Sequence, residues 1–332
     1  MLSKKEMYRY AGDLSQLFYA RQYRLVGGRA DGMRAVDVNN GAGLEFTVYV
    51  DRAMDIGRFS IHGDNCAYLS KAGMAAPAYY DDKMGGWLKT FNGGLLTTCG
   101  LTQVGQPCVD DGEELGLHGD ISAAPAEDFC CEVDMDAEIP EIILRGKMRT
   151  AKIFGKSICM TREIRVKYGD NKVYLTDKVE NLAATRQPYM VLYHMNMGYP
   201  LLDAGVKFET SGEYTGPYAE YPEENIKNRL IYPDVSDSGA EEVYYYKNKA
   251  EKDGMGYAGI YNEKLKKGIR IWTRPEQLDR FANWKNPYAG DYVMGVEPSN
   301  CFVGGREKER ETGLKYIEPY EVKMQELIIE AI

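Results

Sequence analysis

The stretch that decides the fold of this chain is EIRVKYGDNKVYL, residues 163–175. Apolar and charged residues alternate up to Tyr168, the alternation pauses at Gly169-Asp170-Asn171, and it resumes at Lys172. A period of two places successive side chains on opposite faces of a β-strand, and Gly, Asp and Asn are turn-forming residues. The stretch therefore predicts a β-hairpin.

Similar patterns extend outward from this hairpin. Residues 46–50 (FTVYV) and 59–61 (FSI) read as strands, HGDN at 62–65 as a turn, and EVKMQ at 321–325 as a late strand. Residues 3–20 and 81–90 are candidate short helices, but neither has a sustained apolar stripe. The sequence predicts an all-β chain of mostly antiparallel strands with few short helices.

The chain shows no internal repeat and no proline-rich linker, which favours a single domain that spans residues 1–332. Its composition is 44% hydrophobic and 27% charged, as in globular proteins with a sizeable core. All-β domains often exceed 200 residues, so this length is compatible with a single sandwich.

Charge and hydropathy exclude several classes of partner. A net charge of −9 repels the phosphate backbone, so we expect no nucleic-acid partner. The N-terminus lacks the apolar segment of a secretory signal, and no apolar run approaches the ~20 residues that cross a bilayer. We therefore expect a cytoplasmic protein without a membrane partner. Its seven cysteines include no CxxC pair and are expected to be reduced thiols.

Two of the three histidines lie in contexts that suggest a site. His118 is flanked by glycines in LGLHGD (115–120), where the backbone can approach a ligand closely. His194 lies near the end of an apolar strand in YMVLYHMNMGYP (189–200), where a rigid element would position it. A buried, hydrogen-bonded histidine is the alternative for His194. His62 falls in the predicted turn and is expected to be solvated.

Glu297 is the carboxylate that stands out among fifty acidic residues. In VMGVEPSN (293–300) it closes an apolar strand, and the proline that follows it cannot donate to a sheet ladder. Partial desolvation of such a carboxylate favours a role as a base. A carboxylate that caps a loop is the alternative.

The order of LHG (117–119), YHMNMGYP (193–200) and GVEP (295–298) resembles the galactose mutarotase-like superfamily. The resemblance is to its aldose 1-epimerase-related branch of unknown function, a DUF4432-like group, and DRAMDI (51–56) and GGLLTTCGL (93–101) also match that branch. The resemblance covers nearly the whole chain, and the five motifs are fairly specific as an ordered set.

The resemblance implies a large antiparallel β-supersandwich with a sugar site on its concave face. His118, His194 and Glu297 match, in order, the two histidines and the glutamate of the mutarotases. The sequence departs from the family after His194, because the aromatic pair that follows the family's second histidine is missing. A changed substrate pocket is the expected consequence.

On this basis we expect an aldose 1-epimerase (mutarotase)-like enzyme that acts on a free or modified small-molecule sugar. Opening the cyclic hemiacetal takes one base and one acid, and we assign Glu297 as the base and His194 as the acid. A nearby carboxylate favours imidazolium, which would keep His194 charged near neutral pH. We expect no metal or other cofactor, because the chain has no HxH or HExxH cluster.

The remaining predicted site residues bind the sugar. His118 positions it, Arg52 donates to its hydroxyls and Trp284 stacks on it. Polar residues beside the motifs are further candidates for hydrogen bonds to hydroxyls, namely Gln103, Asn196, Asp203 and Arg306.

Two other functions stay open at this stage. The first is a lyase or sugar isomerase on the same scaffold, in which Tyr193 or Tyr199 shares the proton work. The second is a non-catalytic sugar-binding protein, because fold alone does not imply function. The sequence specifies neither the sugar nor the oligomeric state.

Overall fold

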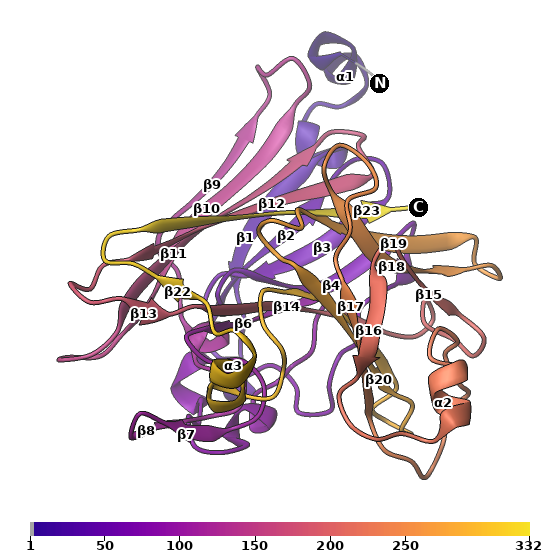
Figure 1. The fold of residues 1–332 in the computed structure, drawn as a ribbon. Helices are drawn as coiled ribbons and strands as arrows, with labels where there is room; N and C mark the ends of the chain where they lie inside the picture. Colours follow the sequence, from indigo (N-terminus) through magenta and orange to yellow (C-terminus); the bar gives the residue numbers. More distant parts are fainter. Residues whose placement is uncertain (1–2) are drawn as a thin grey trace.

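The computed structural model describes residues 3–332, and β-strands dominate it (Figure 1). The first of its large sheets is antiparallel and has eight strands. In spatial order they are β15 (Lys207–Thr210), β18 (Gly256–Asn262), β19 (Lys267–Thr273), β23 (Val322–Ala331), β12 (Lys172–Asn181), β11 (Ser157–Lys167), β10 (Glu141–Ala151) and β9 (Glu127–Asp134).

A second antiparallel sheet has six strands and carries the candidate site. Its spatial order is β16 (Glu213–Pro217), β17 (Glu242–Lys247), β20 (Arg280–Asn286), β21 (Val293–Ser299), β14 (Met190–Met197) and β6 (Leu96–Leu101). Strand β14 lies between β21 and β6, both of which are about 90 or more residues away in the sequence, so the site can form only when these distant segments fold together.

The N-terminal region forms a five-stranded antiparallel sheet, and the remaining strands form two small two-stranded ribbons. The sheet contains β1 (Tyr19–Arg24), β2 (Arg34–Asn39), β3 (Leu44–Tyr49), β4 (Asp55–Ile61) and β5 (Asp64–Asn65). The ribbons pair β7 (Cys108–Asp110) with β8 (Glu113–Leu115) and β13 (Gln187–Pro188) with β22 (Tyr316–Ile317).

The predicted hairpin is confirmed as β11 and β12, with Val166 opposite Val173 and Arg165 opposite Tyr174. Burial alternates along both strands, and their apolar residues face one large core. The same core takes Met195 and Val296 from the six-stranded sheet and Val48 from the five-stranded sheet. Side chains from all three sheets thus share one hydrophobic interior.

Helices are few and short, as expected. They are α1 (Lys4–Tyr10), α2 (Glu223–Lys227) and α3 (Arg306–Thr312). The first begins at a capping box in which Ser3 and Glu6 exchange hydrogen bonds, and it covers less than half of the predicted range 3–20. The helix predicted at 81–90 is wrong, because that segment contains only a 3-10 turn at Gly86–Lys89. None of the helices among residues 3–332 is long and apolar enough to span a membrane.

Candidate active site

The candidate site is centred on a row of side chains that crosses the six-stranded sheet. The pairing of β14 with β6 sets His194 opposite Thr97, and the pairing of β20 with β21 sets Ala282 opposite Glu297. The register that pairs Met195 with Val296 also makes Glu297 the neighbour of His194. Residues opposite each other in an antiparallel pair share a face of the sheet. Sequence-distant His194 and Glu297 therefore lie side by side.

His194 and Glu297 form a buried pair, with His194 Nε2 3.2 Å from Glu297 Oε1. On the other side of the ring, His194 Nδ1 lies 2.6 Å from Asn196 Oδ1. The Asn196 amide nitrogen donates to the carbonyls of Gly94 and His194, which leaves its oxygen as the acceptor for the ring. Nδ1 therefore carries a hydrogen, and Nε2 is the ring nitrogen that faces the Glu297 carboxyl.

Burial determines where that proton rests. It raises the pKa of Glu297 to about 8, with a smaller contribution from the charge of Glu241. Burial also lowers the pKa of His194 to about 4, although the hydrogen bond to Asn196 acts in the opposite direction. Both directions favour a neutral carboxylic acid beside a neutral imidazole. Both directions run against the expectation that the carboxylate keeps His194 charged, because burial disfavours the charged form of each group.

His118 lies next to this pair, with its ring centre 5.7 Å from that of His194. Its backbone adopts a positive φ of 58°, and its Nδ1 accepts the backbone N–H of Gly105 at 3.3 Å. Removal from water, and then the neighbouring His194, lower the pKa of His118 to about 3. The neutral ring accepts at Nδ1 and so carries its hydrogen at Nε2, which can act as a hydrogen-bond donor.

Two tryptophans flank the histidines. Trp87 lies 4.7 Å from His118 between ring centres, and Trp284 contacts His194 edge-on at 5.2 Å and 76°. Phe91 stacks on Trp87 and lies 5.4 Å from His194. Trp272 belongs instead to the eight-stranded sheet, where its indole N–H donates to Glu330. The structure thus brings to the site both Trp284, which the sequence predicts there, and Trp87.

Arg52 does not point donors at a sugar. Its buried guanidinium donates to the main-chain carbonyls of Ser122 at 2.6 Å, Ala75 at 2.9 Å and Thr90 at 3.2 Å. The three acceptors belong to separate loops, two of which adjoin Trp87 and His118 in sequence. Arg52 therefore ties together the loops that form one wall of the site, and its predicted role in binding hydroxyls finds no support.

Gln103 and Arg306 are also engaged within the protein. Gln103 Oε1 accepts the N–H of Arg306 at 2.8 Å, and its amide nitrogen donates to Gln106. The buried Arg306 side chain pairs with Asp110 at 2.5 Å and Glu113 at 2.8 Å. These contacts join α3 to the β7–β8 ribbon that precedes His118. Gln103 and Arg306 therefore support the segment that leads to His118 rather than face a ligand.

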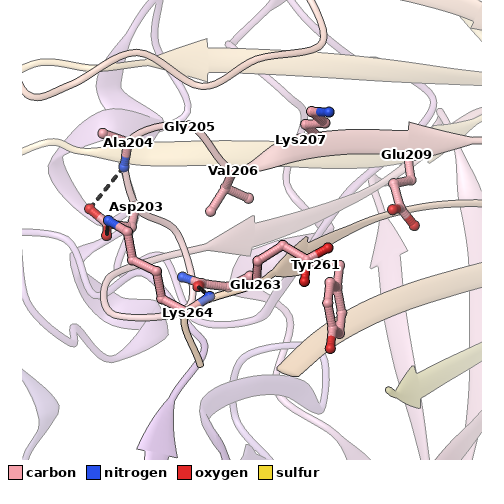
Figure 2. Close-up of a pocket in the computed structure, with 10 residues that line it drawn as sticks. Asp203, Ala204, Gly205, Val206, Lys207, Glu209, Tyr261, Glu263 and Lys264 are labelled. Carbon is pink, nitrogen blue, oxygen red and sulfur yellow. Dashed lines mark hydrogen bonds and ion pairs between the residues drawn. The ribbon is translucent and has the colours of Figure 1, made fainter. Parts of the chain in front are cut away.

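Asp203 lies elsewhere, in a hollow of about 170 Å³ beside β15 and β18 (Figure 2). It pairs there with Lys264 at 2.6 Å and accepts the N–H of Ala204. This hollow borders the eight-stranded sheet, so the structure does not bring Asp203 to the histidines.

The tyrosines of the lyase alternative are not placed for proton transfer at this site. Tyr193 faces the opposite side of β14 from His194, and its hydroxyl donates to Asp177 at 2.8 Å in the core. Tyr199 lies in the turn after β14 with 69% of its surface exposed.

Gly295 is a site residue that sequence reasoning missed. A β-carbon built on it would lie 2.3 Å from Glu297 Oε1 and 3.0 Å from the Cβ of Trp284. Residues 295 and 297 share one face of β21, so the missing side chain leaves the space that the carboxyl occupies. The spacing of glycine and glutamate in GVEP was the signal that could have revealed this.

The described residues, 3–332, contain no group of three or more His, Cys, Asp or Glu side chains arranged to hold a metal ion. The side chains that the fold gathers at this site are two histidines, one glutamate and the aromatic rings around them.

Comparison with known families identifies the family of this chain. The sequence matches the domain of unknown function DUF4432 over residues 30–331. The chain belongs to the DUF4432 family. A search of curated proteins finds no match.

Solved structures confirm the fold expected of this DUF4432 protein. A candidate aldose 1-epimerase from Klebsiella pneumoniae subsp. pneumoniae MGH 78578 matches with a TM-score of 0.89 and 26% identity, over 96% of this chain and 86% of that chain. A galactose mutarotase-like protein from Clostridium acetobutylicum matches with a TM-score of 0.66 and 11% identity, over 96% and 99% of the two chains.

Galactose 1-epimerase from Lactobacillus acidophilus NCFM matches the DUF4432 chain with a TM-score of 0.62 and 12% identity, over 95% of this chain and 99% of that chain. At these low identities the last two matches establish the fold alone. The resemblance inferred from the ordered motifs is confirmed, and the DUF4432 chain has the galactose mutarotase-like supersandwich.

Proposed function

We propose that this protein is an aldose 1-epimerase-like isomerase that interconverts the anomers of a free or modified sugar. The observation that carries the proposal is the buried His194–Glu297 pair, which places two groups able to donate or accept a proton 3.2 Å apart. The anomeric hydroxyl and the ring oxygen of an aldose are bonded to the same carbon. A proton donor and a proton acceptor in the same site can therefore serve both oxygens at once.

In the ring-opening step, His194 Nε2 takes the proton of the anomeric hydroxyl while the Glu297 carboxyl gives its proton to the ring oxygen. The bond between the anomeric carbon and the ring oxygen breaks, and the anomeric C=O forms. After rotation about C1–C2, the hydroxyl that was formed from the ring oxygen adds back to either face of the aldehyde. The new hydroxyl returns its proton to Glu297, and His194 returns its own proton to the carbonyl oxygen.

This direction of transfer reverses the assignment made from the sequence, in which Glu297 was the base and His194 the acid. The reason is the pKa raised by burial at Glu297 and lowered by burial at His194. Each residue still acts as donor and acceptor over a full cycle, because ring closure is the reverse of ring opening. Neutral His118 supplies an Nε2–H for a sugar hydroxyl, and Trp87 and Trp284 supply aromatic surfaces for the C–H faces of the ring.

The test is exchange NMR on a panel of free sugars, which measures the rate of α/β anomer exchange with and without the protein. We expect faster exchange for at least one sugar. Glu297→Gln and His194→Ala should each lower the rate by about 10²–10⁴-fold, the usual contribution of a general acid or base. Circular dichroism should show that both variants remain folded.

Two results would contradict the proposal. If both variants keep full activity, the acid–base assignment is wrong. Sugar binding without faster exchange would instead identify a non-catalytic carbohydrate-binding protein, and an ultraviolet-absorbing unsaturated product would identify a lyase.

A further inference from the structure

Glu241 is an exposed carboxylate at the edge of the candidate site that plays no part in the proton transfers above. Its Oε2 accepts the indole N–H of Trp284 at 2.9 Å. Val243 pairs with Trp284 across β17 and β20, so Glu241, two residues earlier, lies on the same face as the indole. Glu242 has the opposite orientation, 3.8 Å from the buried amine of Lys285.

The indole held by Glu241 is part of the wall of the site. It packs against Val243, Tyr245 and Ala282, and Ala282 lies opposite Glu297 in the neighbouring strand. Trp284 contacts His194 with its ring roughly perpendicular to the imidazole and is partly exposed. Because an indole has a single hydrogen-bond donor, the position of the acceptor fixes the direction in which the ring lies.

We propose that Glu241 is a positioning residue that orients the indole of Trp284 as the aromatic wall of the site. The role in sugar binding rests on the proposed function, whereas the control of the indole orientation does not. A substrate that stacks on this indole would lose that surface if the hydrogen bond were removed.

The charge of Glu241 gives the residue a second influence, on the proton of Glu297. Titratable groups near enough to interact with the charge of Glu297 include His194 from β14, Cys99 from β6, Tyr245 from β17 and Glu241. Burial raises the pKa of both Cys99 and Tyr245, so these two are neutral at pH 7. Among these groups, Glu241 supplies the negative charge that favours the protonated form of Glu297.

The orientation is tested on the full-length protein by its indole N–H signals in a ¹H–¹⁵N NMR spectrum. The chain has three tryptophans, and Trp284→Phe assigns the signal of Trp284 by its loss. Glu241→Ala should shift or broaden that signal, whereas Glu241→Gln, which keeps an acceptor, should move it less. Glu220→Gln removes an exposed charge from a nearby segment and is the matched control, with no shift expected. An unchanged Trp284 signal in Glu241→Ala would overturn the proposal, whether or not the protein is an enzyme.

Kinetic measurements then separate the effect of the Trp284 indole orientation from the effect of the Glu241 charge. Glu241→Ala should raise KM about tenfold, the order of one aromatic contact, and should have no further effect in a Trp284→Phe background. Glu241→Gln should move the alkaline limb of the pH–rate profile down by ~0.5 pH unit, because a nearby negative charge is lost. If KM and the alkaline limb stay unchanged, Glu241 has no role in the reaction.

The two proposals fail in different ways. No anomer exchange with any sugar, together with a shifted Trp284 signal, would refute the proposed function and leave the indole contact standing.

Discussion

Strand β14 separates two buried groups of polar side chains that differ in how completely they are hydrogen bonded. On the core side, Arg162 donates to Asp177 through two nitrogens and to Asp55, and Asp177 also accepts from Tyr193. Thr98 donates to Asp55 through both its N–H and its hydroxyl. On the other side of β14, the Oε1 atom of Glu297 is buried without a hydrogen-bond partner in the part of the chain that the structure describes, although it lies 3.2 Å from His194 Nε2.

The difference indicates what each group is for. The core cluster joins strands of all three large sheets, and every one of its charges has a partner of opposite sign. Polar networks satisfied to this degree stabilise a specific arrangement of the core. The His194–Glu297 pair leaves hydrogen-bonding capacity unused, which is the state expected of a site that must still bind and protonate a substrate. We therefore expect changes in the first group to affect stability, and changes in the second to affect activity.

The largest effect on stability should come from Arg162→Met, which leaves Asp55 and Asp177 buried without their cation. We expect the free energy of unfolding to fall by about 3–5 kcal/mol, measured by chemical denaturation at pH 7. Arg165→Met is the matched control, because Arg165 pairs with Glu163 and Glu141 at the surface of the same strand. It should lose about 1 kcal/mol or less. Equal losses would remove the distinction between buried and surface pairs.

A smaller effect should appear when the stability of the wild type and Glu297→Gln is compared against pH. The pKa of Glu297 is raised from 4.5 to about 8 by folding, so the folded state keeps a proton that the unfolded state releases. Its contribution to stability is complete below pH 4.5 and is lost as the pH rises through 8. The lowered pKa of His194 has the opposite effect, confined to the range between about 4 and 6.5.

Between pH 6.5 and 8 only Glu297 of this pair changes stability. The wild type should there lose about 2 kcal/mol relative to Glu297→Gln, in denaturation curves recorded across that range. Parallel curves for the two proteins would show that Glu297 is not held protonated by the fold.

The smallest of these effects should come from Gly295→Ala, which places a methyl group where the carboxyl of Glu297 lies. We expect the rate of anomer exchange to fall by about tenfold or more, since a misplacement of about 1 Å is enough for such a loss. Gly12→Ala is the control, because nothing lies within 4 Å of the added carbon there. Unchanged exchange in Gly295→Ala would show that the carboxyl position is not critical.

Much of the fold could be predicted because alternation is a local signal. Arg162 shows what this alternation can predict and what it cannot. It is in phase with Ile164 and Val166, so the pattern places it on the buried face of β11. Its partners Asp55 and Asp177 come from two other strands, and nothing in the local sequence pairs them with it.

The candidate site was predictable to a different degree. His194, Glu297 and His118 were found from their motifs, and the structure brings all three together. The sequence predicts contacts with the sugar for Arg52, Gln103 and Arg306 because each is a polar residue within or beside a family motif. In the folded chain these groups bond to main-chain carbonyls and buried carboxylates, partners that a sequence does not display.

The sequence by itself determined the period-two strands, the hairpin at residues 163–175 and the identity of the histidines and glutamate, because these depend on neighbours within a few residues. Only the tertiary structure decided the directions in which the pKa values of the pair shift and the contacts of Gly295 and Glu241. The pKa of a buried group depends on solvent exclusion and on charges brought close by folding. Both are set by strands that lie far apart in the chain.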